Sequence, residues 1–195
     1  MLTKYSIKST DHYLDHFIVY DFEAILKPTL VKHGKNTTFT NEHIPVSVSV
    51  ADSLTKEVRC FVNDDPKTLL TDMFKYVASV SVKIQRYNVD KYVPLLRKII
   101  AAQGLTGMEI PGIELGKTYT MSDVDSWIKG GRYGSFFDFH NSIGFGKQRS
   151  DYGKIKEQID QAPVLGFNSG RYDINLIKND LFAVIGTDNI KSVIK

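Results

Sequence analysis

Cysteine is nearly absent from this sequence of 195 residues, which contains only Cys60. One thiol excludes an internal disulfide framework and a cysteine-based zinc cluster. No apolar run approaches the roughly 18 residues needed to span a bilayer, and residues 1–8 lack the apolar centre of a signal peptide. We therefore expect a soluble protein of a reducing compartment (cytoplasm, nucleus or virus) with no membrane partner.

A strong excess of one charge is also missing. The 25 basic and 22 acidic residues give a net charge of +3, which tolerates a nucleic-acid partner without indicating one. With 42% hydrophobic and 24% charged residues, the composition is that of a globular protein with a substantial core. The length predicts one domain over residues 1–195.

A short apolar segment is followed by two closely spaced carboxylates. Residues 17–20 (Phe-Ile-Val-Tyr) predict a buried strand, because aromatic and β-branched side chains suit a pleated core surface. Asp21 and Glu23 come next, and positions i and i+2 of a strand share a face. Neighbouring carboxylates repel unless a cation lies between them, and Mg²⁺ or Mn²⁺ is the usual choice of an oxygen site. A solvated strand end explains the Asp-x-Glu pattern equally well.

The following residues predict two further strands. Pro28 should end or bend the first strand, and residues 31–43 are polar enough for a hairpin loop with exposed histidines. Residues 44–51 alternate apolar and small polar side chains, the pattern of a half-buried strand. Residues 58–62 should form a third strand, antiparallel to the second.

Helices should follow. Pro66 suits a first helical turn, and apolar residues keep helical spacing from Leu69 to Ile84. Residues 88–90 interrupt the pattern, so we expect a second helix after them that ends at Gly104. Both apolar stripes are more typical of core than of a binding groove.

Residues 105–150 differ in character, because half of the 14 glycines lie between positions 104 and 134. We expect an irregular segment or an insertion whose one regular element is a helix over 123–129, capped by Ser122. Residues 132–149 mix aromatic and basic side chains. Packing of these aromatics on the core or on a missing neighbour is favoured over stacking against a single nucleic-acid strand, and an insertion without a role in the fold is a third alternative.

The last third regains regular patterns. The expected elements are a helix over 151–161, a buried strand over 162–167, a turn over 168–171, a helix from Tyr172, and strand or helix fragments over 182–185 and 190–194.

Asp173 would lie in the first turn of that helix, just beyond a buried strand, where an α/β sheet presents its ligand crevice. Its carboxylate could complete a metal site with Asp21 and Glu23, while Asn168 and Tyr172 could position a reacting strand. Alternatively, residues 168–170 form only a turn and Asp173 serves the helix dipole.

These two motifs resemble those of a known family. Tyr20-Asp-Phe-Glu23 is similar to the first exonuclease motif (Asp-x-Glu) of family B DNA polymerases, and Asn168-Ser-Gly-Arg-Tyr-Asp173 to the second (Asn-x-x-x-Phe/Tyr-Asp). The residues in and around the second motif are most similar to those of the protein-primed branch, which is found in viruses, linear plasmids and virus-like transposons. The resemblance implies an α/β fold of the ribonuclease H-like type, a mixed sheet with flanking helices, that excises mismatched 3′ nucleotides.

The resemblance also implies roles for particular residues. Asp21, Glu23 and Asp173 would hold two Mg²⁺ or Mn²⁺ ions, one activating water and the other steadying the leaving 3′ oxygen. Asn168, Tyr172 and Phe22 would contact the 3′ end of single-stranded DNA. A polymerase domain would be the natural partner.

Three departures limit this expectation. The third motif, Tyr-x-x-x-Asp, has no match, because no tyrosine follows Tyr172. The paired aspartates of a polymerising palm are absent, and Ala24 replaces the hydroxyl residue common after the motif's glutamate. We therefore expect an exonuclease region that is incomplete at its C-terminus and weak or inactive alone. A catalytically inert nucleic-acid-binding relic and a non-functional gene fragment are the alternatives.

Overall fold

The computed structural model describes residues 14–35, 37–105, 108–112, 117–144, 150–167 and 172–185. Close contacts group these residues into two units. The sheet unit is built from His16–Val80 and from the chain after Ala162. The helical unit is built from Ser81–Ala162 and the segment that ends at Asp15. The segment 105–150, expected to be irregular or inserted, lies within the helical unit.

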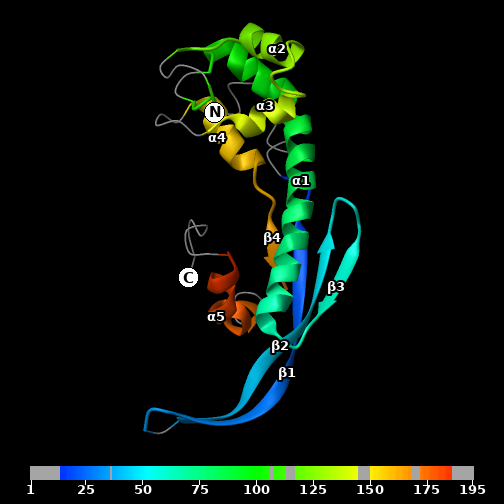
Figure 1. The fold of residues 1–195 in the computed structure, drawn as a ribbon, viewed down its shortest axis with the longest axis vertical. Coiled ribbons are helices and arrows are strands. Elements are labelled where there is room, and N and C mark those ends of the chain that lie inside the picture. The colour runs from blue at the N-terminus through cyan, green and yellow to red at the C-terminus, as the bar shows by residue number, and fades with distance from the viewer. Residues whose placement is uncertain are drawn as a thin grey trace. The chain divides into compact units, whose positions relative to one another are not determined.

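A four-stranded mixed sheet organises the sheet unit, as predicted for an α/β protein (Figure 1). Its strands are β1 (Ile18–His33), β2 (Thr37–Asp52), β3 (Val58–Val62) and β4 (Val164–Gly166), in the order β3-β2-β1-β4. The first three form an antiparallel meander, whereas β4 is parallel to β1.

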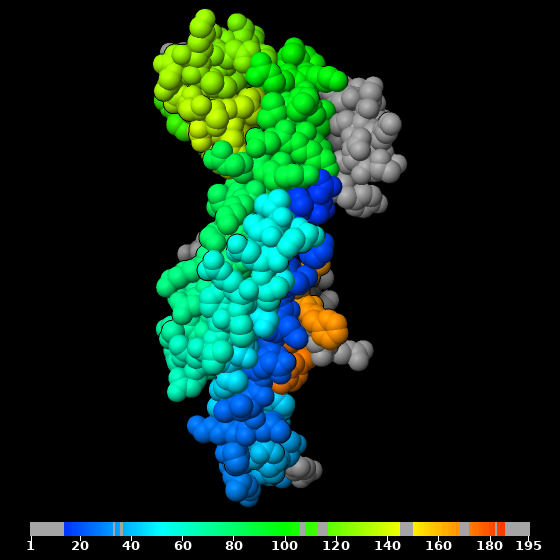
Figure 2. All heavy atoms as spheres, turned by 90° about the vertical axis from the view of Figure 1, so that its right-hand side faces the viewer, coloured from blue at the N-terminus to red at the C-terminus, as the bar shows by residue number. Residues whose placement is uncertain are grey.

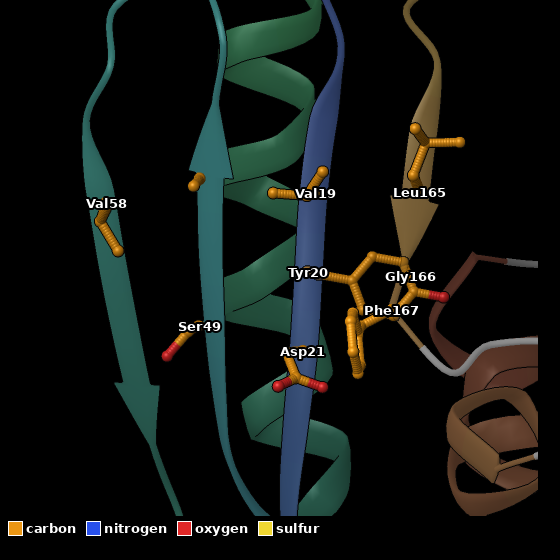
Figure 3. Close-up of a pocket in the computed structure, with 9 residues that line it drawn as sticks. Val19, Tyr20, Asp21, Ser49, Val58, Leu165, Gly166 and Phe167 are labelled. Carbon is orange, nitrogen blue, oxygen red and sulfur yellow. The ribbon is translucent and has the colours of Figure 1, made fainter.

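One face of this sheet carries the core of the unit. Along β1 the side chains of Ile18, Tyr20 and Phe22 are buried, and their neighbours on β2, Val48 and Val50, are buried too. The N-terminal part of α1 (Pro66–Gln103) covers this face (Figure 3). By the alternation of a strand, Val19, Asp21 and Glu23 point to the other face. The sheet therefore has one face covered by α1 and one that presents acidic side chains.

The loop predicted over residues 31–43 is wrong. Strand β1 continues through Pro28 to His33, and β2 already begins at Thr37. Pro28 is tolerated because the register shifts between Pro28 and Val31, so the missing N–H falls at an irregularity of the ladder. The described turn residues between them are 34 and 35.

The helix boundary predicted at residues 88–90 is also wrong, because α1 is continuous from Pro66 to Gln103. Val89 is fully buried, and the Asn88 side-chain amide donates to the carbonyl oxygens of Ile159 (3.1 Å) and Gln161 (3.3 Å). Asn88 therefore holds the C-terminal end of α4 (Asp151–Ile159) and does not break its own helix. Gly104 ends α1 with φ +67°, as predicted.

The helical unit packs α2 (Met121–Lys129), α3 (Phe136–Ser142) and α4 (Asp151–Ile159) on the second half of α1. The expected Ser122 cap of α2 is replaced by Thr120, which forms a capping box with Asp123. Helix α3 was not predicted. Its aromatic side chains enter the core together with Trp127, which confirms packing for the described part of residues 132–149. The last helix, α5 (Ile174–Ile185), belongs to the sheet unit.

Candidate functional site

Asp21 is exposed on the face of the sheet opposite to α1 (Figure 3). Glu23, two positions further along β1, is exposed too and by the alternation of the strand points to the same face. They pair across the ladder with Ser49 and Ser47 of β2. Two positions along a strand separate their Cα atoms by about 7 Å. The two carboxylates therefore share one face of the strand, as their spacing of two predicts.

Asp173, which directly precedes α5, is buried, with 1% of its surface exposed. It is therefore in a different environment from the two exposed carboxylates of β1. Over the ranges that the model describes, no three or more His, Cys, Asp or Glu side chains form a group that could hold a metal ion. The structure places Asp21 and Glu23 on one face and does not gather Asp173 with them into a metal-binding set.

The chemistry of the pair suits one cation better than two. Mg²⁺ is commonly held by one or two carboxylates, several waters and a substrate phosphate, so an exposed Asp-x-Glu pair can supply the protein part of such a site. Two ions bridged by shared carboxylates need further ligands. The pair alone does not provide them.

The predicted DNA contacts fall in different places. Phe22 is 4% exposed and packs edge-to-face against Tyr20, with ring centroids 5.6 Å apart, so it belongs to the core rather than to a surface that could contact DNA. Tyr172 is half-buried, and its hydroxyl group shares a 2.7 Å hydrogen bond with Nδ1 of His43. Asn168 lies outside the described residues.

The contact between Tyr172 and His43 was not anticipated. Their rings also meet edge-to-face with centroids 5.6 Å apart, which ties the start of α5 to β2. The two residues are 129 positions apart in sequence. No local pattern signals such a pairing, since His43 was expected in an exposed loop.

A hollow of about 350 Å³ borders Asp21 on the open face of the sheet (Figure 3). Its lining is mostly apolar and comes from all four strands and the residue after β4: Val19, Tyr20, Asp21, Ser49, Ala51, Val58, Leu165, Gly166 and Phe167. Phe167 is 90% exposed at its edge. No local pattern signals this hollow, because the order β3-β2-β1-β4 that brings its lining residues together is set by the tertiary structure.

A second group of titratable side chains lies inside the helical unit. His140 of α3 is fully buried, and its Nε2 is 2.8 Å from Oδ1 of Asp160. The other oxygen of Asp160 accepts from Nζ of Lys156 at 2.8 Å, and Lys156 also donates to the His140 carbonyl oxygen. Burial would raise the pKa of Asp160, but the hydrogen bonds from His140 and Lys156 lower it to about 2. This group holds α3 against α4, and His140, which has no exposed surface, is not accessible to a substrate.

Comparison with protein-family models, curated proteins and solved structures finds no match to this chain. No helix within the described ranges is both long enough and apolar enough to cross a membrane.

Proposed function

We propose that this chain is an exonuclease-type domain of the family B DNA polymerase kind, whose parent reaction is metal-dependent 3′–5′ hydrolysis of DNA. The observation that carries the proposal is the position of Asp21 and Glu23 on β1, which lies between β2 and β4 in the sheet. Asp173 follows β4, the parallel neighbour of β1, so both motifs belong to adjacent strands.

The architecture supports the proposal at a coarse level. A mixed four-stranded sheet with flanking helices is compatible with the ribonuclease H-like fold that the two motifs imply. The long separation between Asp21 and Asp173 is accounted for by the helical unit, which occupies the sequence between Val80 and Pro163. DNA with a frayed 3′ end is the substrate, and a polymerase domain the partner, that the proposal requires.

The chain alone should be a weak nuclease. The motif Tyr-x-x-x-Asp has no match after Tyr172, and the three carboxylates are not gathered into one group. Loss of one member of a catalytic set removes most of the rate, because the effects of such residues are far from additive.

Metal binding and cleavage should be measured separately. Mn²⁺ titration followed by electron paramagnetic resonance is expected to show binding that falls about tenfold or more in Asp21→Asn and in Glu23→Gln, since each variant removes a carboxylate ligand. The matched control Asp64→Asn changes an exposed acid just before α1 and should bind Mn²⁺ as the parent does. Equal binding in all four proteins would exclude the proposed metal site.

Cleavage of 5′-labelled single-stranded DNA, with Mg²⁺ or Mn²⁺, is expected to be slow in the parent and unchanged by Asp64→Asn. Robust cleavage that disappears in Asp21→Asn would contradict the argument that the site is incomplete.

Among the described residues, the buried Asp173 forms no metal-binding group with the exposed pair. This favours one alternative, a domain that binds single-stranded nucleic acid without cleaving it. That alternative predicts salt-sensitive binding that persists in Asp21→Asn. Loss of binding in this variant would exclude it.

A further inference from the structure

Beyond the sheet, β1 and β2 continue as a two-stranded ribbon, defined here as residues 24–43. Strand β3 pairs only with residues 47–51, and β4 only with residues 18–20. Within the described part of the chain, the ribbon strands therefore pair only with each other. Figure 1 shows the ribbon extending past β3 and β4, and in Figure 2 its atoms (blue) form a narrow projection from the sheet.

The ribbon exposes more apolar surface than an isolated element should. Its large apolar side chains are between 51% and 86% exposed: Ile25, Leu26, Leu30, Val31 and Phe39. Val31 and Phe39 are cross-strand partners near the turn, and Leu30 beside them is the most exposed of the five. A two-stranded hairpin is marginally stable in water by itself, and exposed apolar surface is a mark of interaction sites.

The polar side chains of the ribbon indicate which kind of partner fits. Three lysines and one glutamate give residues 24–43 a charge of +2, two thirds of the net charge of the chain. The glutamate, Glu42, lies opposite Lys27, which leaves Lys32 and Lys35 near the turn without an acidic neighbour across the ribbon. Four threonines and two asparagines supply further groups of the kind that contact phosphate and sugar.

We propose that this ribbon binds double-stranded DNA, with Lys32 and Lys35 on the phosphates and the apolar side chains near the turn against the groove. A two-stranded β-ribbon fits the major groove, which is about 12 Å wide. In that groove an apolar side chain such as phenylalanine can contact the methyl group of thymine. A protein partner would account for the apolar surface but not for the excess of lysine over acidic residues in the ribbon.

The ribbon does not include Asp21 or Glu23, so its binding to DNA does not depend on a metal ion at that pair. Binding of a 20-base-pair duplex should be followed by fluorescence anisotropy in EDTA, so that cleavage and metal binding play no part. The double variant Lys32→Gln/Lys35→Gln is expected to lower the affinity about tenfold or more. It should also reduce the magnitude of the slope of the logarithm of the binding constant against the logarithm of the salt concentration by about 2, because two phosphate contacts are lost.

The control is Lys83→Gln/Lys98→Gln, which removes the same charge from exposed positions of α1 and should leave both quantities nearly unchanged. Leu30→Ser should weaken binding without changing the salt slope, since it removes an uncharged contact. Circular dichroism spectra that match the parent would show that the variants fold.

Three outcomes would overturn the proposal. One is equal loss of duplex affinity in the ribbon and control variants. Another is a loss confined to single-stranded DNA of the same length. The third is a dimer, detected by light scattering, that Leu30→Ser disrupts while duplex affinity stays unchanged, because the ribbon would then join two copies of the chain.

Discussion

The hydroxyl oxygen of Tyr152 lies 2.8 Å from Nδ1 of His140, and both side chains are buried. Because the ionised Asp160 can only accept, the imidazole must carry its proton on Nε2. Nδ1 of the neutral ring then accepts the hydroxyl proton of Tyr152. Burial lowers the pKa of His140 despite the nearby carboxylate of Asp160, so the neutral ring is the stable form at neutral pH.

The stability of the protein should fall as the pH drops below 6.5, the ordinary pKa of histidine. His140 stays neutral in the folded protein while the unfolded chain takes up a proton, so acid favours unfolding. Urea unfolding at pH 7.5 and 5.5 should show a loss of up to about 1.4 kcal/mol from this residue. For each protein, the free energy of unfolding at pH 5.5 is compared with its own value at pH 7.5. The loss that His140 causes in the parent should be absent from His140→Gln.

The matched control for this experiment is His16→Gln, a half-buried histidine of the sheet unit. It should keep the pH dependence of the parent. A parent and a His140→Gln variant with the same pH profile would show that His140 titrates alike in both states.

Lys156→Met should destabilise the protein by about 3 kcal/mol, because breaking a buried pair leaves the Asp160 carboxylate without its cation. Lys156 is 4% exposed and also donates to the His140 carbonyl oxygen. The control Lys154→Met lies on the same helix but is exposed, so its effect should stay within about 0.5 kcal/mol. Thermal or urea unfolding measures both. Equal effects would mean that Lys156 is not part of a buried pair.

Gly104→Ala should cost more stability than Gly131→Ala, although both glycines have positive φ angles of +67° and +77°. The backbone conformation alone costs an L-residue about 1–2 kcal/mol. A Cβ atom at Gly104 would also meet the Thr118 side chain and the Tyr119 carbonyl oxygen, whereas none lies within 4 Å at Gly131. Chemical denaturation of the two variants tests the difference, and equal losses would contradict the crowding at Gly104.

Phe22→Ala should reduce stability by about 3–5 kcal/mol, the usual cost of removing a buried aromatic side chain. If Phe22 contacted DNA instead, its replacement by alanine would leave the melting temperature unchanged and weaken DNA binding. Phe167→Ala is the control, because its ring is 90% exposed and should be nearly neutral for stability. A stable Phe22→Ala variant with weakened DNA binding would support the role that the motif implied for this residue.

Local sequence patterns were sufficient to predict the helices and strands whose apolar residues recur with a regular period. Alternation predicted the core of β2 and the pairing of β3, and helical spacing predicted most of α1, α2 and α4. They failed where a polar segment forms a strand, as in the ribbon, since its ladder is continuous although its side chains are exposed. They failed again at Asn88, because the partners of its amide belong to the end of α4.

The sequence by itself determined that Asp21 and Glu23 share a face, because spacing of two on a strand dictates this directly. Only the tertiary structure decided that Asp173 is buried whereas Asp21 and Glu23 are exposed, that the Tyr172 hydroxyl group forms a hydrogen bond with His43, and that Phe22 belongs to the core. These relations join segments far apart in the chain. They depend on sheet order and on which face each helix covers, quantities that no local pattern of residues contains.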